Sequence, residues 1–296
     1  MRDLTVFGDP VLDYVYKLGD PICIGGKMLG RFAEMVPGGT TANMACAAAR
    51  LGLGVALVGR VGRGREGAMQ RDALRLGGVD AQLTEVDAMR GTHCVIMVNP
   101  DGEKTVIFVP MSASPVPEAT IAEQMLQCRF AYIMAADFAV IASHSANGPQ
   151  ICVDVDAAAG LTTRAFEDLR DKADVIFIND VGYQKLTGSV PNEAGLRAMI
   201  GPRAHTLCCT GGAGVTWLLS QDELMSRSAL PAKVIDTTGA GDCFNAAFLT
   251  RIAERAAPAE ALDFAMAAGA LATETLGARA AAPTRAVIEA RMLLLQ

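Results

Sequence analysis

The sequence predicts an α/β fold with a mostly parallel central sheet and a small β lid. Short runs rich in β-branched residues alternate with segments of helical periodicity, which is typical of βαβ units. Most of these runs lack the period-two alternation of half-exposed strands, as expected when both faces of a parallel sheet are buried. The chain of 296 residues is 51% hydrophobic and 20% charged, so it can form a large core and is not expected to be disordered.

The expected elements of the main body follow one another along the chain. The strands expected in the central sheet are Leu4–Gly8, Val55–Gly59, Phe130–Ala135, Ile151–Val155, Val175–Ile178, Leu207–Thr210 and Val215–Leu219. The helices expected between them are Thr41–Leu51, Glu66–Leu76, Glu118–Leu126, Thr163–Arg170 and Glu193–Ile200. From Ala240 onward the pattern is helical almost throughout.

Two segments interrupt this alternation of strands and helices, and they predict the lid. His93–Val98 and Lys104–Val109 flank a turn cluster that starts at Asn99-Pro100, which favours a β-hairpin. Tyr14–Val36 is extended, punctuated by glycine and without helical period. We therefore expect a lid of residues 13–36 and 92–110 on a body of residues 1–12, 37–91 and 111–296.

Composition excludes several classes of partner. The net charge of −6 argues against nucleic acid, whose phosphates require clustered Lys and Arg. No apolar stretch has the length of a membrane span, so no membrane partner is expected. The eight cysteines are scattered, which is unlike a disulfide framework. Because Met1-Arg2-Asp3 leads directly into a strand rather than a signal peptide, we expect a cytoplasmic protein.

The strongest local motif is Asp236-Thr237-Thr238-Gly239-Ala240-Gly241-Asp242. Phe244, Phe248 and Ile252 recur at helical spacing, so a helix begins near Ala240. The Gly-Ala-Gly sequence leaves the backbone N–H groups of the first turn uncovered, which creates an anion site. A carboxylate repels a bound phosphoryl group, but it can accept the proton of a substrate hydroxyl that lies between the two. The alternative is that Asp242 only caps the helix.

This motif resembles the C-terminal signature of the ribokinase-like (PfkB) carbohydrate kinases. Pro37-Gly38-Gly39-Thr40-Thr41-Ala42-Asn43 is similar to the first signature of that family, and Val58-Gly59-Arg60-Val61-Gly62 matches as well. The matches run from Gly8 to Pro283 in family order. The resemblance implies a three-layer sandwich with a β lid over a sugar site, and it implies ATP and Mg²⁺ as cofactors.

The resemblance also implies roles for individual residues. Asp242 matches the catalytic base, and the anion hole corresponds to Gly239, Ala240 and Gly241. The substrate-binding positions are Asp13, Gly38, Gly39 and Asn43, although Asp13 can also be interpreted as a turn cap and Asn43 as a helix cap. The nucleotide-binding positions are Asn179, Thr210, Gly212 and Gly214. Asp236 and Thr238 match positions near a monovalent-cation site, which would hold K⁺.

One departure from the family pattern concerns the metal. Gly182 stands where relatives carry a Glu that organises Mg²⁺, between Asn179 and Leu186-Thr187-Gly188. Asp180 is the candidate that would supply the missing carboxylate through water. We therefore expect either a weakened dependence on Mg²⁺ or a shifted metal.

A second departure lies at Gly62-Arg63-Gly64-Arg65-Glu66-Gly67, which by chance spells the dinucleotide fingerprint G-x-G-x-x-G. We reject that interpretation because the preceding strand is expected to end at Gly59, which leaves Arg60 and Val61 between the strand and the motif. Arg63 and Arg65 either form a solvated face or favour an anionic substrate such as a sugar phosphate or sugar acid.

The function expected from these observations is ATP-dependent phosphorylation of a primary hydroxymethyl group on a small sugar: a pentose, a ketohexose or a sugar acid. A nucleoside kinase of the same family is one alternative, although an aromatic content of 5% provides few rings for base stacking. Two further alternatives are a catalytically weak, sugar-sensing homologue and a nicotinamide-dependent oxidoreductase. Exposed edges of the lid also predict a homodimer formed through the lid.

Overall fold

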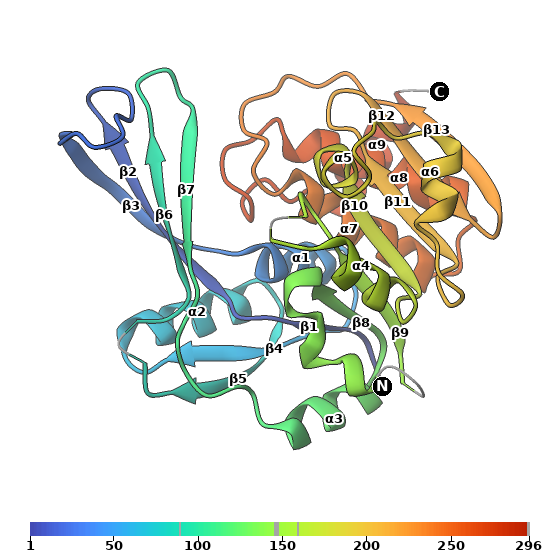
Figure 1. The fold of residues 1–296 in the computed structure, drawn as a ribbon, viewed down its shortest axis with the longest axis horizontal. Helices are drawn as coiled ribbons and strands as arrows, with labels where there is room; N and C mark the ends of the chain where they lie inside the picture. Colours follow the sequence, from blue (N-terminus) through green and yellow to red (C-terminus); the bar gives the residue numbers. More distant parts are fainter. Residues whose placement is uncertain (89, 145–147, 159, 295–296) are drawn as a thin grey trace.

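The computed structural model describes residues 1–88, 90–144, 148–158 and 160–294. Within these residues a nine-stranded sheet has the order β13-β12-β11-β10-β9-β8-β1-β4-β5 (Figure 1). The strands from β11 to β5 are parallel, and β12 and β13 are antiparallel. Their bounds are β1 Arg2–Phe7, β4 Val55–Gly62, β5 Asp80–Val86, β8 Cys128–Met134, β9 Gln150–Asp154, β10 Val175–Asn179, β11 Thr206–Thr210, β12 Val215–Ser220 and β13 Glu223–Ser228.

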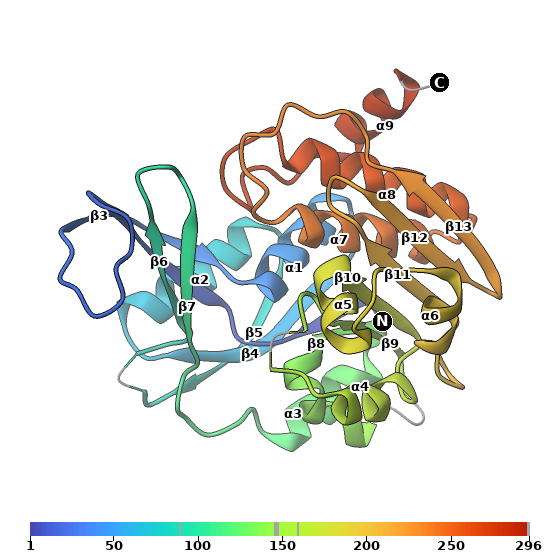
Figure 2. The ribbon, with the colours of Figure 1, turned by 45° about the horizontal axis from the view of Figure 1, so that its top comes forward.

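Helices cover both faces of this sheet, which confirms the three-layer sandwich (Figure 2). One apolar cluster joins the sheet to α1 Thr40–Arg50, α2 Arg65–Leu76, α7 Ala240–Ala253, α8 Pro258–Ala272 and α9 Arg285–Leu293. The other cluster joins the opposite face to α3 Glu118–Leu126, α4 Thr163–Arg170, α5 Asp180–Thr187 and α6 Glu193–Ala198. The short 3₁₀ helices Ala135–Val140 and Ala142–His144 lie between β8 and β9.

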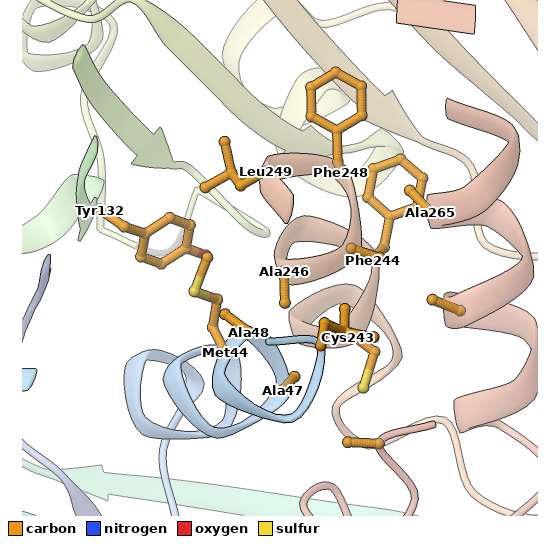
Figure 3. Packing of buried hydrophobic residues seen from close by; sticks show 14 of the residues in the cluster. Met44, Ala47, Ala48, Tyr132, Cys243, Phe244, Ala246, Phe248, Leu249 and Ala265 are labelled. Atoms are coloured by element: carbon orange, nitrogen blue, oxygen red, sulfur yellow. The ribbon is translucent and has the colours of Figure 1, made fainter. Parts of the chain in front are cut away.

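Alternate residues of the central strands enter opposite clusters. In β9, Cys152 packs with the α1/α7 layer, whereas Ile151 and Val153 pack with the α3/α4 layer. Both faces therefore need apolar side chains, which explains why these strands show no period-two pattern. Figure 3 shows alanines such as Ala47 of α1 and Ala246 of α7 among the larger side chains of the first cluster. Small residues let helices approach closely, and α7 is thereby fixed against α1.

The lid is a separate sheet of order β3-β2-β6-β7, standing beside the body in Figure 1. Its strands are β2 Val11–Leu18, β3 Gly30–Gly38, β6 His93–Val98 and β7 Lys104–Val109. The hairpin strands β6 and β7 have the predicted bounds. Strands β2 and β3 extend past the predicted limits at residues 13 and 36, because they run without interruption into the body. The division of the chain into body and lid at fixed residues therefore remains an interpretation.

The strand predicted over Val55–Gly59 is longer than expected, so its predicted end at Gly59 was wrong. β4 continues to Gly62, and Arg63-Gly64 form the turn into α2, so the strand does precede the G-x-G-x-x-G string directly. The dinucleotide interpretation fails for another reason. Tyr14 of the lid donates a hydrogen bond to Glu66 Oε1 at 2.6 Å, which places a carboxylate in the first turn of α2, where a pyrophosphate would bind. Arg63 and Arg65 are exposed to solvent.

Two strands, β5 and β13, and one α-helix, α5, were missing from the sequence prediction, as were both 3₁₀ helices. Strand β5 is only partly buried and β13 is a polar edge strand, so neither forms an apolar run. Helix α5 follows β10 directly and contains Gly182, which weakens its helical pattern. In the part of the chain that the structure describes, no helix is long and apolar enough to cross a membrane.

Candidate active site

The first turn of α7 has the backbone that the glycine motif predicts. Gly239 precedes the helix with φ 81°, and a Cβ built on it would lie 2.6 Å from the Cβ of Ala278. Only glycine fits this position without strain. A Cβ on Gly241 would meet no atom within 4 Å, so there is open space over the turn. The amide of Ala240 donates to the Thr237 carbonyl at 3.2 Å. An anion therefore has room to approach this turn beside Asp242.

A chain of hydrogen bonds connects Asp242 to the predicted sugar side. Asn43 Nδ2 of α1 donates to Asp242 Oδ2 at 3.0 Å. Arg279 Nε donates to Asn43 Oδ1 at 3.1 Å, and Arg279 Nη2 donates to the Gly38 carbonyl at 2.8 Å. The side chain of Asn43 thus holds the carboxylate, so its interpretation as a helix cap was wrong. Arg279 was not predicted, because it lies after α8 and has no motif around it.

Asp13 lies beside the same glycine pair. It sits within β2, opposite Val36 and Cys94, so its interpretation as a turn cap was also wrong. A Cβ on Gly38 would lie 2.1 Å from Asp13 Oδ2, and Gly39 has φ 93°. Burial raises the pKa of Asp13, whereas a hydrogen bond with Cys94 and the charge of Arg279 lower it. The structure therefore brings Asp13, Gly38 and Gly39 to the same end of the body as Asn43.

The carboxyl group of Asp242 is poised to exchange a proton near neutral pH. Burial is the largest influence on its pKa and raises it, and the hydrogen bond from Asn43 opposes that rise. The negative charges of Asp154 and Asp156 raise the pKa further, and the positive charge of Arg279 lowers it. The balance raises the pKa of Asp242 to about 7. A general base is most effective when its pKa lies close to the working pH.

The activity should depend on pH through this group. If Asp242 is the catalytic base, as the family resemblance implies, it must be ionised to act, and kcat/KM should rise about tenfold per pH unit below pH 7 and reach a plateau above it. A pH profile between pH 5 and 9 with a saturating co-substrate measures this dependence. A flat profile across that range would show that the ionised carboxylate is not required.

Buried polar groups bind Asp154, the residue whose negative charge raises the pKa of Asp242. Tyr132 of β8 donates to Asp154 Oδ2 at 2.5 Å, and Asn245 Nδ2 of α7 donates to the same oxygen at 2.9 Å. Burial, the largest influence, raises the pKa of Asp154 to about 6 despite these hydrogen bonds. Asp154 and Asp156 were not predicted, although two carboxylates at the end of a buried strand were a usable signal.

The predicted nucleotide-side residues meet at the carboxyl ends of β10 and β11. Asn179 and Thr210 are direct neighbours across the two strands. The loop after Thr210 has Gly212 at φ 57°, and the Gly214 amide donates to the Gly211 carbonyl at 2.7 Å. Asp154 and Asp156 lie at the carboxyl end of the neighbouring strand β9. Open parallel sheets bind ligands at this edge.

Asn179 organises the segment in which the expected glutamate is missing. Its Oδ1 accepts from the Gly182 amide at 2.8 Å, and its Nδ2 donates to Asp156 Oδ1 at 2.9 Å. A Cβ on Gly182 would lie 2.1 Å from the Asp156 carbonyl oxygen, so no larger side chain fits there. Asp180 Oδ1 accepts from the Val181 amide at 2.9 Å, in the first turn of α5.

Replacing Gly182 with alanine should destabilise the protein. The added methyl group must displace the backbone of Asp156, and overpacking of this kind typically costs about 1–3 kcal/mol. Thermal unfolding measures the loss. Gly269→Ala in α8 is the matched control, because its Cβ would have ordinary contacts at 3.5 Å or more, and alanine stabilises a helix interior by up to about 1 kcal/mol. Equal melting temperatures for the two variants would contradict this packing explanation.

The predicted monovalent-cation position already carries a positive charge. Lys104 Nζ of the lid donates to Asp236 Oδ1 at 3.0 Å and to Thr238 Oγ1 at 3.1 Å. Burial opposes ionisation of Asp236, but hydrogen bonds from Thr238, Gly277 and Lys104 outweigh it and lower the pKa to about 2. These residues therefore do not fit a K⁺ ion in this arrangement. Among the described residues, no group of three or more His, Cys, Asp or Glu side chains forms a metal centre.

The fold and the site define a carbohydrate kinase of the PfkB type. Residues 1–285 match the pfkB family of carbohydrate kinases, and the chain belongs to this family. It is 29% identical to a ribokinase of Bacillus subtilis over 98% of this chain and 99% of the relative. It is 30% identical to a fructokinase of Klebsiella pneumoniae over 95% of this chain and 96% of the relative.

Solved structures confirm the fold. A ribokinase from Thermotoga maritima superimposes with a TM-score of 0.86 at 21% identity, covering 99% of this chain and 100% of the other. An Arabidopsis thaliana ribokinase complexed with ribose and ATP has a TM-score of 0.83 at 23% identity, covering 98% of each chain. The large, mostly parallel sheet and the second small sheet of this chain are those of the ribokinase fold.

Proposed function

We propose that the protein transfers the γ-phosphoryl group of ATP to a primary hydroxymethyl group of a pentose, ketohexose or sugar acid. The observation that carries this proposal is the buried Asp242 carboxylate, which lies in the open first turn of α7 and is hydrogen-bonded to Asn43 on the sugar side. The curated relatives described above are a ribokinase and a fructokinase, which supports a sugar as the acceptor.

In the proposed reaction, residues of this chain accept the proton and stabilise the transferred phosphoryl group. Asp242 accepts the proton of the substrate hydroxyl as its oxygen forms a bond to the γ-phosphorus, and the bond from that phosphorus to the β-phosphate oxygen breaks. The amides of Gly239 and Gly241 stabilise the charge on the transferred group, since that of Ala240 already donates to the Thr237 carbonyl. Asp13 and Asn43 orient the hydroxyl groups of the sugar. ADP leaves, and Asp242 returns its proton to solvent.

Oxygen ligands at the nucleotide edge suit Mg²⁺. Asp156 and Asp180 supply exposed or half-exposed carboxylates there, whereas both oxygens of the buried Asp154 already accept hydrogen bonds. Mg²⁺ in kinases binds through one or two carboxylates together with substrate phosphates. When bound, the ion neutralises charge on the phosphates. We propose that Asp180 contributes through water. An Asp180→Ala variant with an unchanged rate and an unchanged Mg²⁺ requirement would contradict that role.

A screen of ADP release tests the proposal. ATP, Mg²⁺ and the enzyme are combined with pentoses, ketohexoses, sugar acids, sugar phosphates and nucleosides, with a reaction lacking acceptor as the control. Rapid release with a free sugar or sugar acid supports the proposal. Release with nucleosides alone would identify a nucleoside kinase instead, and no release with any acceptor would indicate a sugar-sensing homologue. The cytoplasm, where ATP is supplied, is the compartment that this activity implies.

We also propose that a second copy of the chain pairs with the lid. β3 and β7 form the edges of the lid sheet, and Phe32, Ile107 and Phe108 on these strands are about half exposed. Edge strands with exposed apolar side chains favour pairing with another sheet. Light scattering should give a dimer mass for the wild type and a monomer mass for Ile107→Lys. A monomeric wild type at assay concentration would contradict the dimer.

A further inference from the structure

Lys104 connects the lid to the loop that leads into the anion hole. It is the first residue of β7, and its ammonium group contacts Asp236 and Thr238, which precede Gly239 by one to three residues. Alternation along β7 places Lys104 on the same lid face as Phe108. Residues that are paired across neighbouring strands point to the same face of a sheet. Phe108 of β7 is paired with Cys94 of β6, and Cys94 is paired with Asp13 of β2, so Asp13 lies on that face as well. One face of the lid therefore carries both the sugar-side carboxylate and this lysine.

The oxygens of Asp236 are fully engaged. Oδ1 accepts hydrogen bonds from the Thr238 amide, the Thr238 hydroxyl and Lys104, and Oδ2 accepts from the Gly277 amide at 3.0 Å. The Asp236 side chain is 7% exposed, whereas that of Lys104 is 43% exposed. A buried carboxylate that loses its counter-charge is strongly destabilised. The ammonium group of Lys104 therefore stabilises the loop that contains Asp236, although much of the Lys104 side chain is exposed to solvent.

We propose that Lys104 is a tethered cation that takes the place of a monovalent metal ion at Asp236 and Thr238. Because this lysine belongs to the lid, the charge balance beside the anion hole depends on the position of the lid. Lys104 acts through Asp236 and the loop, which makes it a positioning residue. This inference rests on the proposed kinase function. An ordinary surface ion pair would contribute only about 0–1 kcal/mol and would leave no response to metal ions when it is removed.

The test compares Lys104→Met with the wild type in KCl and in choline chloride at equal ionic strength, about 0.1 M. The wild-type rate should differ less than about twofold between the two salts. For Lys104→Met, kcat/KM in choline chloride should fall about tenfold or more, and KCl should restore part of it in a saturable manner. Lys104→Arg keeps the charge and should remain insensitive to KCl. Lys27→Met, which removes an exposed lysine from the lid loop, is the control for lid charge.

Thermal unfolding provides a readout that is independent of activity. If K⁺ enters the vacated position, KCl should raise the melting temperature of Lys104→Met by about 2–4 °C relative to choline chloride. The wild type and Lys27→Met should show no such difference. The proposal is overturned if the wild type itself requires K⁺, or if Lys104→Met responds to KCl in neither rate nor melting temperature. Failure of every sugar in the ADP screen would refute the kinase function alone, because the melting comparison does not depend on turnover.

Discussion

Asp242→Asn is expected to lower kcat by about 10²–10⁴-fold while the dissociation constants of sugar and nucleotide stay within a few-fold of the wild-type values. The amide has nearly the same shape and still fits beside Asn43, but it cannot accept the hydroxyl proton. Steady-state kinetics and calorimetric titration measure the two effects separately. Asp20→Asn in the exposed lid loop is the matched control and should keep wild-type turnover. A variant that retains more than about a hundredth of the rate would contradict the role of Asp242 as the base.

The same variant should be more stable than the wild type at alkaline pH. Asp242 has a pKa of about 7 in the folded protein and about 4 when unfolded, so the folded state binds more protons between these values. The contribution of Asp242 to the free energy of unfolding therefore falls as pH rises from about 4 to 7, whereas the neutral asparagine lacks this dependence. Melting temperatures should be higher for Asp242→Asn at pH 8, and the difference should shrink toward pH 4.

Arg279→Met should raise the KM for the sugar by about 10- to 100-fold. Its guanidinium group holds both Asn43 and the Gly38 carbonyl, and each charged hydrogen bond contributes about 1.5–3 kcal/mol. Its charge also lowers the pKa of Asp242, so the midpoint of the pH profile should move upward in the variant. Arg279→Lys should not restore activity fully, because an ammonium group cannot reproduce the two-pronged geometry.

A control separates this effect from a general loss of charge. Arg164→Met removes an exposed arginine from α4 and should leave the KM for the sugar and the pH midpoint unchanged. If Arg279→Met leaves both quantities at their wild-type values, Arg279 does not position the sugar side of the site.

The sequence predicted those elements whose pattern is local. α3, α4, β6 and β7 have the expected bounds, because apolar periodicity and turn residues are contained within each segment. β5 and β13 were missed because partly exposed strands at the end of a sheet need few apolar residues. The extension of β4 to Gly62 was missed because glycine breaks the apolar run, although its backbone still pairs with β5.

The site was predictable where residues belong to motifs and unpredictable where they meet only through the fold. Asp242 and Asn43 stand in recognisable strings, and the structure joins them by a hydrogen bond. Arg279 and Lys104 reach their partners across more than 100 residues, so no spacing in the sequence indicates either contact. The loss of the glutamate at Gly182 became explicable only with the position of the Asp156 carbonyl oxygen.

Single-turnover transfer is the most direct measurement of the central claim, that the carboxylate of Asp242 takes the proton from the attacking hydroxyl. Enzyme in excess over the sugar found in the screen is mixed with labelled ATP at pH 8, and the phosphorylated sugar is quantified over time. We expect the transfer rate constant of Asp242→Asn to be lower than that of the wild type by about 100-fold or more, with the sugar still bound. Rate constants within about tenfold of each other would contradict proton transfer to Asp242.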